Sequence, residues 1–347
     1  MNNLFKFRMK AFALIALLLV SLSSAFAQTK IAIIDAGSSG SRLYVYEISR
    51  DGKSVTTLCN KKENLPLSKV AVHADSVKAY LQKMTQLYDN QGKTPIDLYV
   101  LATAGMRYEP KGNAEKIYGY IKTTAQSVNE YCIKEATTIS GRYEGLCAWI
   151  ALNYDCKKIG TGTSTLRNPL TSTPTFGIIE IGGASMQITY TVPDSLTLFK
   201  TDSISRDGFS RIYSKSFLGG GVDQIYKNFG EGNANTDYSK GNNGINSLPD
   251  LTGVNTTFYG LGKPMELVIN GMKANGNFEN YKATLKPGDE YHPLSNAHYI
   301  NWLIGQLNIN AAKIKIPQNE ISWTKGAALD IVINGAQPEA FDYGKPN

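Results

Sequence analysis

The sequence predicts an α/β protein built from two related domains. Strand-like and helical segments alternate along the chain, and 347 residues are enough for two hydrophobic cores. One turn pattern also occurs twice, as IIDAGSSGSRL at 33–43 and as IIEIGGASMQI at 178–188. The two copies match position by position in kind: an apolar run, an acid, small residues, and apolar residues again. Each copy opens an α/β run, so we expect two domains that hold one ligand from two sides.

The first 27 residues have the features of a secretory signal. Three basic residues precede the apolar run 11–20, and an A-x-A cleavage site ends at Ala27. The run is shorter than the ~20 residues that a membrane span needs. We expect cleavage after Ala27 and a secreted or periplasmic protein without a transmembrane span, with an uncleaved anchor as the alternative.

The charge of the chain is modest and evenly spread. The formal net charge is +7, and Lys and Arg form no basic block. A mild positive balance suits an anionic substrate. We therefore expect a small-molecule anion as ligand, no nucleic-acid partner, and a monomer.

Four cysteines follow the predicted signal, at positions 59, 132, 147 and 156. An even number in an oxidising compartment predicts disulfides, with three possible connectivities, or buried thiols. Zinc is the alternative, but Cys59, Cys132, Cys147 and Cys156 have no C-x-x-C spacing, and the chain has only three histidines.

The first half of the chain alternates strands and helices. Residues 30–48 read as strand, tight turn and strand, and 96–102 as a buried strand. Helical spacing of apolar residues predicts helices in 68–90, in 117–128 and from 141 onward. A short strand is expected at 135–140.

The second half opens with the same hairpin pattern at 176–193. A Gly- and Asn-rich stretch, 230–247, predicts a surface loop. A helix is expected at 296–309, and the chain ends with ISWTKGAALDIVING.

The first turn, DAGSSGSR, suits a phosphate. Small residues allow backbone amides to approach an anion, and Ser hydroxyls add donors. The candidate phosphate-binding residues are Gly37, Ser38, Ser39, Gly40, Ser41 and Arg42. Asp35 ends a buried strand and is a natural partner for a metal ion or its waters. A plain hairpin turn is the structural alternative.

The second turn, EIGGASMQ, has the same chemistry. The candidate phosphate-binding residues are Gly182, Gly183, Ala184 and Ser185. Glu180 faces a metal ion, and Gln187 orients a water. Two such turns, each with one carboxylate at a strand end, would hold a metal-bound phosphoryl group between two domains.

Two further stretches carry chemistry. LATAGMR, at 101–107, ends a strand with Thr103, which can donate to a phosphate or a water. GRYEGLCAW, at 141–149, places Glu144 at a strand-to-helix junction, where a carboxylate can act as a general base. An acid favoured by the helix dipole in the first turn is the alternative for Glu144.

Together these motifs resemble the ecto-nucleoside triphosphate diphosphohydrolases, or apyrases, of the GDA1/CD39 type. The family's five ordered regions are similar to DAGSSGSR, ATAGMR, GRYEGLCAW, EIGGASMQ and a late W-x-x-G-A that begins at Trp323. The resemblance implies two ribonuclease-H-like domains of the actin-like ATPase superfamily with the active site in the interdomain cleft. It places 28–143 plus 325–347 in domain I and 144–324 in domain II.

The resemblance also implies hydrolysis of nucleoside tri- and diphosphates with a divalent cation, Mg²⁺ or Ca²⁺. Glu144 is then the base, Ser185 and Gln187 position the water with Thr103 close by, and Asp35 and Glu180 hold the hydrated metal. The family has Asp where Glu180 stands, which lengthens that contact. The loop 308–321 lacks the family's base-stacking aromatic residue, so Tyr259 and Tyr291 are the candidates for binding the base.

Two rival functions remain. Exopolyphosphatases and guanosine-pentaphosphate phosphatases share the fold and the duplicated turns, but they usually carry a Gly-Gly-Gly-Ser turn. The other rival is a secreted nucleotide-binding protein whose catalytic site has decayed, against which the intact Glu144, Ser185 and Gln187 argue.

Overall fold

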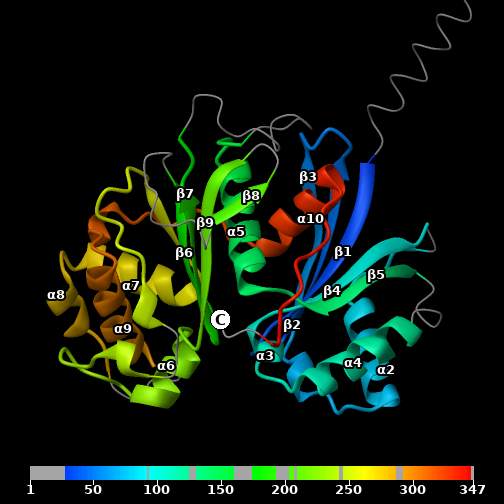
Figure 1. The fold of residues 1–347 in the computed structure, drawn as a ribbon, viewed down its shortest axis with the longest axis horizontal. Helices are drawn as coiled ribbons and strands as arrows, with labels where there is room; N and C mark the ends of the chain where they lie inside the picture. Colours follow the sequence, from blue (N-terminus) through cyan, green and yellow to red (C-terminus); the bar gives the residue numbers. More distant parts are fainter. Residues whose placement is uncertain are drawn as a thin grey trace, which may run out of the picture.

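A computed structural model describes residues 28–91, 94–124, 130–159, 174–192, 203–206, 209–241, 245–286 and 292–344 (Figure 1). The predicted signal, 1–27, and Tyr291 lie outside these residues. Among the helices of the described part, none combines the length and the apolar character that crossing a bilayer would require.

The first sheet has five strands in the order β3-β2-β1-β4-β5. A meander of three antiparallel strands, β1 to β3, is followed by β4 and β5, which run parallel to β1. The strands are β1 (Gln28–Ala36), β2 (Ser41–Ser49), β3 (Val55–Glu63), β4 (Ile96–Ala102) and β5 (Tyr131–Thr138).

The second sheet repeats this pattern in the order β10-β6-β7-β9-β8. Strands β6, β7 and β9 form the antiparallel meander, β10 runs parallel to β6, and β8 extends the far edge. In the first sheet, β5 lies beside β4 at the edge. At the equivalent edge of the second sheet, Tyr259 of β10 forms a single parallel bridge with Lys315. The strands are β6 (Gly177–Ile181), β7 (Ser185–Thr191), β8 (Ser203–Arg206), β9 (Phe209–Leu218) and β10 (Phe258–Leu261).

The strand register confirms the repeat seen in the sequence. Asp35 lies opposite Arg42 in the first hairpin, and Glu180 lies opposite Gln187 in the second. The two acids therefore occupy equivalent strand ends, and the two turns that follow are equivalent as well.

Helices separate and flank the two sheets, as Figure 1 shows. Two helices cover the outer face of the first sheet: α2 (Ala74–Thr85) and α4 (Lys111–Thr124). Four helices lie on the outer side of the second sheet: α6 (Val222–Phe229), α7 (Lys263–Ala274), α8 (Phe278–Lys282) and α9 (Pro293–Gln306). Between the sheets lie α5 (Gly141–Asp155), which packs on the second sheet, and α10 (Trp323–Asn334), which packs on the first. This is the two-domain actin-like α/β architecture that the sequence predicts.

The central helix α5 is buried on all sides. Twelve of its fifteen residues are buried, and Ser140 caps its start by accepting a hydrogen bond from the Tyr143 amide. A helix that is apolar all round belongs in a core rather than at a surface. A Cβ on Gly326 of α10 would lie 1.8 Å from the Cys147 carbonyl oxygen, so only glycine permits this close crossing of α5 and α10. The two helices thereby join both sheets in one central core.

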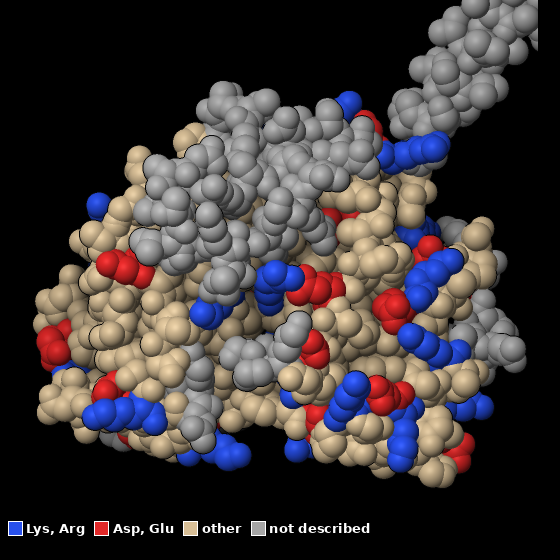
Figure 2. Space-filling model, in the orientation of Figure 1, with Lys and Arg blue, Asp and Glu red and all other residues tan. Residues whose placement is uncertain are grey.

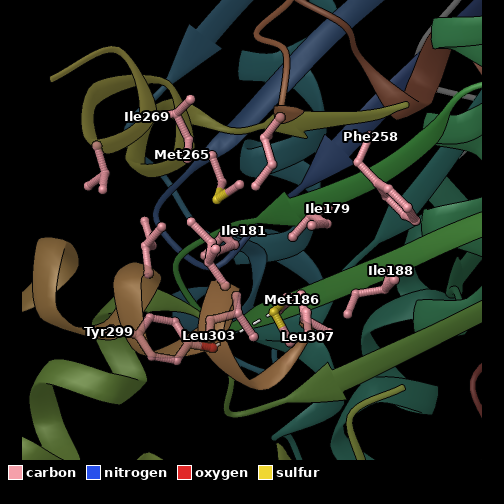
Figure 3. Close-up of a cluster of buried hydrophobic side chains, with 14 of the residues drawn as sticks. Ile179, Ile181, Met186, Ile188, Phe258, Met265, Ile269, Tyr299, Leu303 and Leu307 are labelled. Atoms are coloured by element: carbon pink, nitrogen blue, oxygen red, sulfur yellow. Dashed lines mark hydrogen bonds between the residues drawn. The ribbon is translucent and has the colours of Figure 1, made fainter. Parts of the chain in front are cut away.

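A second core lies outside the second sheet (Figure 3). Successive residues of β6 face opposite sides, because Ile178 belongs to the central core and Ile179 to the outer one. This explains the continuous apolar run of the strand. The outer core draws side chains from β6, β7, β10, α7 and α9, among them Ile179, Ile181, Met186, Ile188, Phe258, Met265, Ile269, Tyr299, Leu303 and Leu307.

The predicted disulfides are wrong for this structure, because all four cysteines are free thiols. Cys59 and Cys132 lie on opposite edge strands, about four strand spacings of ~4.8 Å apart. Cys147 and Cys156 are nine residues apart along α5, or about 13 Å, far beyond the reach of a disulfide. Cys59 and Cys147 also face different cores. No group of three or more potential metal ligands occurs among the described residues, so zinc is not supported there either.

The stretch predicted as a surface loop, 230–247, is partly core. Tyr238 and Ile245 begin short 3-10 helices and are buried in the outer core of the second sheet. The predicted helix 68–90 is shorter than expected, since α2 begins only at Ala74 after a 3-10 turn. The predicted domain boundaries fall in the first turns of α5 and α10 and stay a prediction.

Candidate active site

The two equivalent turns face each other between the sheets. A Cβ placed on Gly183 would lie 3.3 Å from the Ser38 hydroxyl, so the tips of the two turns are nearly in contact. The same Cβ would lie 2.3 Å from an Asp223 carboxylate oxygen at the start of α6. A larger residue at 183 would therefore displace the Asp223 side chain, because the second turn is enclosed here by the first turn and by α6.

Glu144 lies beside these turns in the first turn of α5 and is only 8% exposed. Its Oε2 accepts a hydrogen bond at 2.5 Å from Nη2 of Arg107, a fully buried side chain. Arg107 Nε donates to the Ile139 carbonyl at 3.0 Å, which fixes the guanidinium. The guanidinium therefore fixes the position of one Glu144 oxygen beside the turns.

Gln187, on β7, joins Glu144 to the second turn. Its Nε2 donates to Ser185 Oγ at 2.8 Å and lies 3.4 Å from Glu144 Oε2. The structure thus brings Glu144, Ser185 and Gln187 together in one hydrogen-bonded group, although α5 and β7 are separated by about forty residues of sequence.

The motif GRYEG explains how α5 comes so close to the second sheet. A Cβ on Gly141 would lie 2.1 Å from Ser216 Oγ, and one on Gly145 would lie 2.8 Å from Thr189 Oγ1. Both glycines lie on the helix face that meets β7 and β9. Larger residues there would push α5 away and carry Glu144 out of reach of Gln187.

Burial and neighbouring acids disfavour the ionised form of the two carboxyl groups at the strand ends. Burial raises the pKa of Asp35 to about 7, and the nearby Glu144 charge contributes to this rise. A hydrogen bond from Trp323 lowers the pKa and offsets part of the rise. Burial, Glu144 and Asp35 also raise the pKa of Glu180 well above its usual value. Within the described part of the chain, Glu180 Oε2 is buried and accepts no hydrogen bond.

This donor set fits a hard divalent cation. A buried carboxylate oxygen without a partner, next to a second carboxylate, calls for a positive charge, and Mg²⁺ and Ca²⁺ prefer oxygen ligands. The described residues offer no cluster of three direct ligands. A cation here would therefore be held largely through its waters, as Mg²⁺ usually is.

A cavity of about 510 Å³ adjoins the carboxylates and has room for those waters. Asp35 and Glu180 form one wall, and the loop 316–323 forms the other. Arg42 and Glu320 line this cavity and form an ion pair, with 2.6 Å between Arg42 Nη1 and Glu320 Oε1.

The remaining predicted residues have different surroundings. Thr103 is buried at the start of α3 (Ala104–Arg107), and its amide donates to the Ala36 carbonyl at the base of the first turn. Ser41 is buried and its hydroxyl donates to the Leu65 carbonyl, so a contact with phosphate through its backbone stays a prediction.

Tyr259, predicted to bind the base, has its ring in contact with the protein core. Its ring packs against Phe176, with ring centroids 5.0 Å apart, on the side of β10 that faces the central core. It does not line the described cavities. Strand alternation causes this, because the neighbouring Phe258 takes the outer side.

Three residues of the site were not among the candidates. Arg107 and Trp323 lie inside motifs that the sequence analysis singles out, and a buried arginine beside an acid could have been inferred from ATAGMR. Ser216, on β9, accepts a hydrogen bond from Gln187 Nε2 at 3.2 Å. Only the strand register, which pairs Ser216 with Gln187, reveals its place.

Comparisons with known proteins identify the family. The sequence model of the GDA1/CD39 (nucleoside phosphatase) family matches residues 27–258. The chain is 28% identical to nucleoside-triphosphatase ntp-1 of Caenorhabditis elegans over 65% of its length. It is 29% identical to mouse ectonucleoside triphosphate diphosphohydrolase 1 over 55% of its length, and 32% identical to probable apyrase 3 of Arabidopsis thaliana over 56%. These alignments span 45%, 41% and 41% of the relatives, so the chain covers less than half of their length.

Solved structures show the fold. A Ppx/GppA family member from Aquifex aeolicus has a TM-score of 0.56 at 13% identity, over 90% of this chain and 100% of that one. An exopolyphosphatase from Cytophaga hutchinsonii has a TM-score of 0.53 at 12% identity, over 90% and 100%. At such identities the likeness concerns the fold alone. The family match spans more than half of the chain, and the protein therefore belongs to the GDA1/CD39 (nucleoside phosphatase) family.

Proposed function

We propose that this protein hydrolyses nucleoside tri- and diphosphates and releases the terminal phosphate. The observation that carries the proposal is the group of Glu144, Gln187 and Ser185 beside the two turns. Oε2 of Glu144 is held by Arg107 and lies 3.4 Å from Nε2 of Gln187, which also donates to Ser185, so the acid adjoins the pair that would position a water.

In the proposed reaction the two turns bind the phosphates through backbone amides and the hydroxyls of Ser38, Ser39 and Ser185. Gln187 and Ser185 orient a water in line with the terminal phosphate, and Glu144 takes its proton. Asp35 and Glu180 hold a hydrated divalent cation, which neutralises phosphate charge when bound. Phosphoryl transfer depends mainly on such positioning and charge neutralisation, so no covalent enzyme intermediate is required.

A second cavity, of about 620 Å³, offers a place for the nucleoside. It adjoins the second turn, because Asp223, which touches Gly183, also lines it. Pro264 and Leu267 give it an apolar wall, and its volume is in the usual range for a small-molecule site. His292 adds a flat ring, which is stacked on Tyr226. We propose this cavity, in place of Tyr259, as the site of the base and ribose.

Truncation of Leu267 tests this place for the nucleoside. We expect Leu267→Ala to raise the KM for ATP about 3- to 10-fold with little change in kcat, because the variant loses apolar contact but no reacting group. Hydrolysis of inorganic tripolyphosphate, if detectable, should not change. Val72→Ala, at another exposed apolar residue, is the control. An unchanged KM for ATP would place the nucleoside elsewhere.

A substrate panel tests the proposed function itself. Purified protein 28–347 with Mg²⁺ is expected to release phosphate from ATP and ADP, but not from AMP, and faster from ATP than from long-chain polyphosphate. Faster release from polyphosphate would establish the exopolyphosphatase alternative. Nucleotide binding without turnover would establish a decayed, purely binding protein.

Cation binding should depend on pH because of Asp35. With a pKa of about 7 in the fold, against 3.8 for an unperturbed Asp, this carboxyl is protonated near pH 6. In cation-free protein the raised pKa makes the stability contribution of this group fall as pH rises from about 4 to 7. Binding of a cation requires the ionised form, so the rise in Tm on adding saturating Mg²⁺ should be larger at pH 8 than at pH 6.

Asp35→Asn is the control for this experiment, since its Tm rise should be smaller and should depend less on pH, with only Glu180 of the two carboxylates left to ionise. A wild-type Tm rise that does not change with pH would contradict the role of Asp35 in holding the cation.

The wider setting is also a proposal. We propose a secreted or periplasmic monomer that acts on nucleotides outside the cytoplasm. Figure 2 shows basic and acidic side chains interspersed on the visible face of the molecule, which supports a small anionic substrate bound in a cleft rather than on a charged surface.

A further inference from the structure

Ser216 lies next to the proposed catalytic group without being part of a recognised motif. It is on β9, directly opposite Gln187 of β7 in the strand register. Its Oγ accepts a hydrogen bond at 3.2 Å from Gln187 Nε2 and lies in the notch that Gly141 leaves in α5. Three elements therefore meet at one hydroxyl.

The hydrogen bonds of the Gln187 amide account for this arrangement. The amide nitrogen has two hydrogens, and its two closest acceptors are Ser185 Oγ at 2.8 Å and Ser216 Oγ at 3.2 Å. Glu144 Oε2 lies slightly farther, at 3.4 Å. If the amide were flipped, its oxygen would face Glu144 Oε2, and two hydrogen-bond acceptors would oppose each other. The Glu144 carboxylate therefore determines that Gln187 points its nitrogen, and not its oxygen, toward α5.

The consequence is that Gln187 Oε1 is left to accept a hydrogen bond from the attacking water. Without Ser216 the amide nitrogen would keep only Ser185 and the longer contact with Glu144, whereas the two hydroxyls together give each amide hydrogen a close acceptor and hold the plane of the amide. We propose that Ser216 is a positioning residue, which holds the Gln187 amide so that its oxygen faces the attacking water. This inference rests on the proposed function and adds a residue to the same site.

The strand offers a matched control two residues away. Ser214 lies on the same strand, pairs with Thr189 of β7 at 2.8 Å, and donates to the Arg142 carbonyl at 2.8 Å. It also faces a glycine of α5, Gly145. Both serines thus face a glycine of α5 from the same strand, but only Ser216 contacts the amide.

The test measures kcat, KM and Tm for Ser216→Ala and Ser214→Ala with ATP and Mg²⁺. Loss of one hydrogen bond of about 0.5–1.5 kcal/mol predicts a kcat about 2- to 12-fold lower for Ser216→Ala, with KM little changed. Ser214→Ala should keep kcat and KM while losing a similar amount of Tm.

A double-mutant cycle with Gln187→Ala shows whether Ser216 acts through the amide. In the Gln187→Ala background, Ser216→Ala should lower kcat no further. An equal loss in both backgrounds, or an unchanged kcat in the single variant, would overturn the positioning role. Wild-type rates for Gln187→Ala would instead contradict the proposed reaction, so the two failures are distinguishable.

Discussion

Glu144→Gln is expected to lower kcat for ATP by at least ~10²-fold, with KM little changed. A positioned general base typically contributes ~10²–10⁴-fold to a rate. The amide keeps the shape of the side chain and can still accept from Arg107 Nη2, but it cannot take a proton from water. Substrate is held by the turns and the cation rather than by Glu144, so binding should survive.

The buried ion pair adds a second expected effect of the same substitution. Arg107 is fully buried and pairs with Glu144 at 2.5 Å, so a neutral partner leaves its charge uncompensated. We expect a loss of about 1.5–3 kcal/mol in the free energy of unfolding, the range for hydrogen bonds to charged groups, which a domain of this size tolerates.

Glu339→Gln is the matched control. Glu339 also accepts hydrogen bonds from an arginine, Arg142, and from Ser140 at the start of α5, but it lies on the surface away from the turns. Its variant should keep wild-type rates. If Glu144→Gln binds a non-hydrolysable ATP analogue poorly but turns over normally per bound substrate, Glu144 is a binding residue and its catalytic role is wrong.

The sequence was sufficient for the parts of the fold that local patterns determine. The duplicated turn predicted two equivalent hairpins, and the register places Asp35 with Arg42 and Glu180 with Gln187 as that comparison requires. The alternation of apolar runs predicted the α/β class. Both signals depend on near neighbours in the chain, where strand and turn geometry follow directly from residue type.

The sequence was insufficient where placement depends on contacts between distant segments. Ser216 looks like an ordinary strand serine until β9 pairs with β7. Tyr259 resembles a ligand-binding aromatic residue, yet strand alternation turns it toward Phe176. The cysteines suggested disulfides because their number was even, whereas sheet order and helix length keep them apart.

Arg42 also has a contact that the sequence did not predict, although it lies inside a recognised motif. Its place in DAGSSGSR predicted a phosphate contact, but in the structure it pairs with Glu320 and donates to the Tyr44 hydroxyl at 2.9 Å. Glu320 lies on a loop nearly 280 residues later in the chain, and no local pattern announces it. Both contacts use Nη1 of the guanidinium, and the phosphate contact of Arg42 stays a prediction.

Removal of the divalent cation is expected to abolish phosphate release from ATP, and addition of Mg²⁺ or Ca²⁺ to restore it. The chemistry of the site is the reason, because Asp35 and Glu180 are oxygen donors that suit a hard cation. Full activity in the presence of a chelator would contradict a role for these two carboxylates in catalysis.

Variants of Glu180 test whether this residue holds the cation or is only an acid at a strand end. Glu180→Ala should lose about 10- to 100-fold in activity, the usual cost of removing a group that contacts a metal through its waters. Glu180→Asp should keep substantial activity and shift the preference between Mg²⁺ and Ca²⁺, since it shortens the side chain by one methylene and Mg²⁺ demands stricter geometry.

Stability should change in the opposite direction from activity. Glu180 Oε2 is buried and has no hydrogen-bond partner among the described residues, and burial raises the pKa of this carboxyl. A raised pKa means that the stability contribution of this group falls as pH rises above the unfolded pKa, so at pH 8 the carboxyl destabilises the cation-free protein. Glu180→Ala should therefore raise Tm in chelator at pH 8 while it removes activity. A variant that keeps the wild-type rate, or that loses rate and stability together, would show that Glu180 serves the fold rather than the cation.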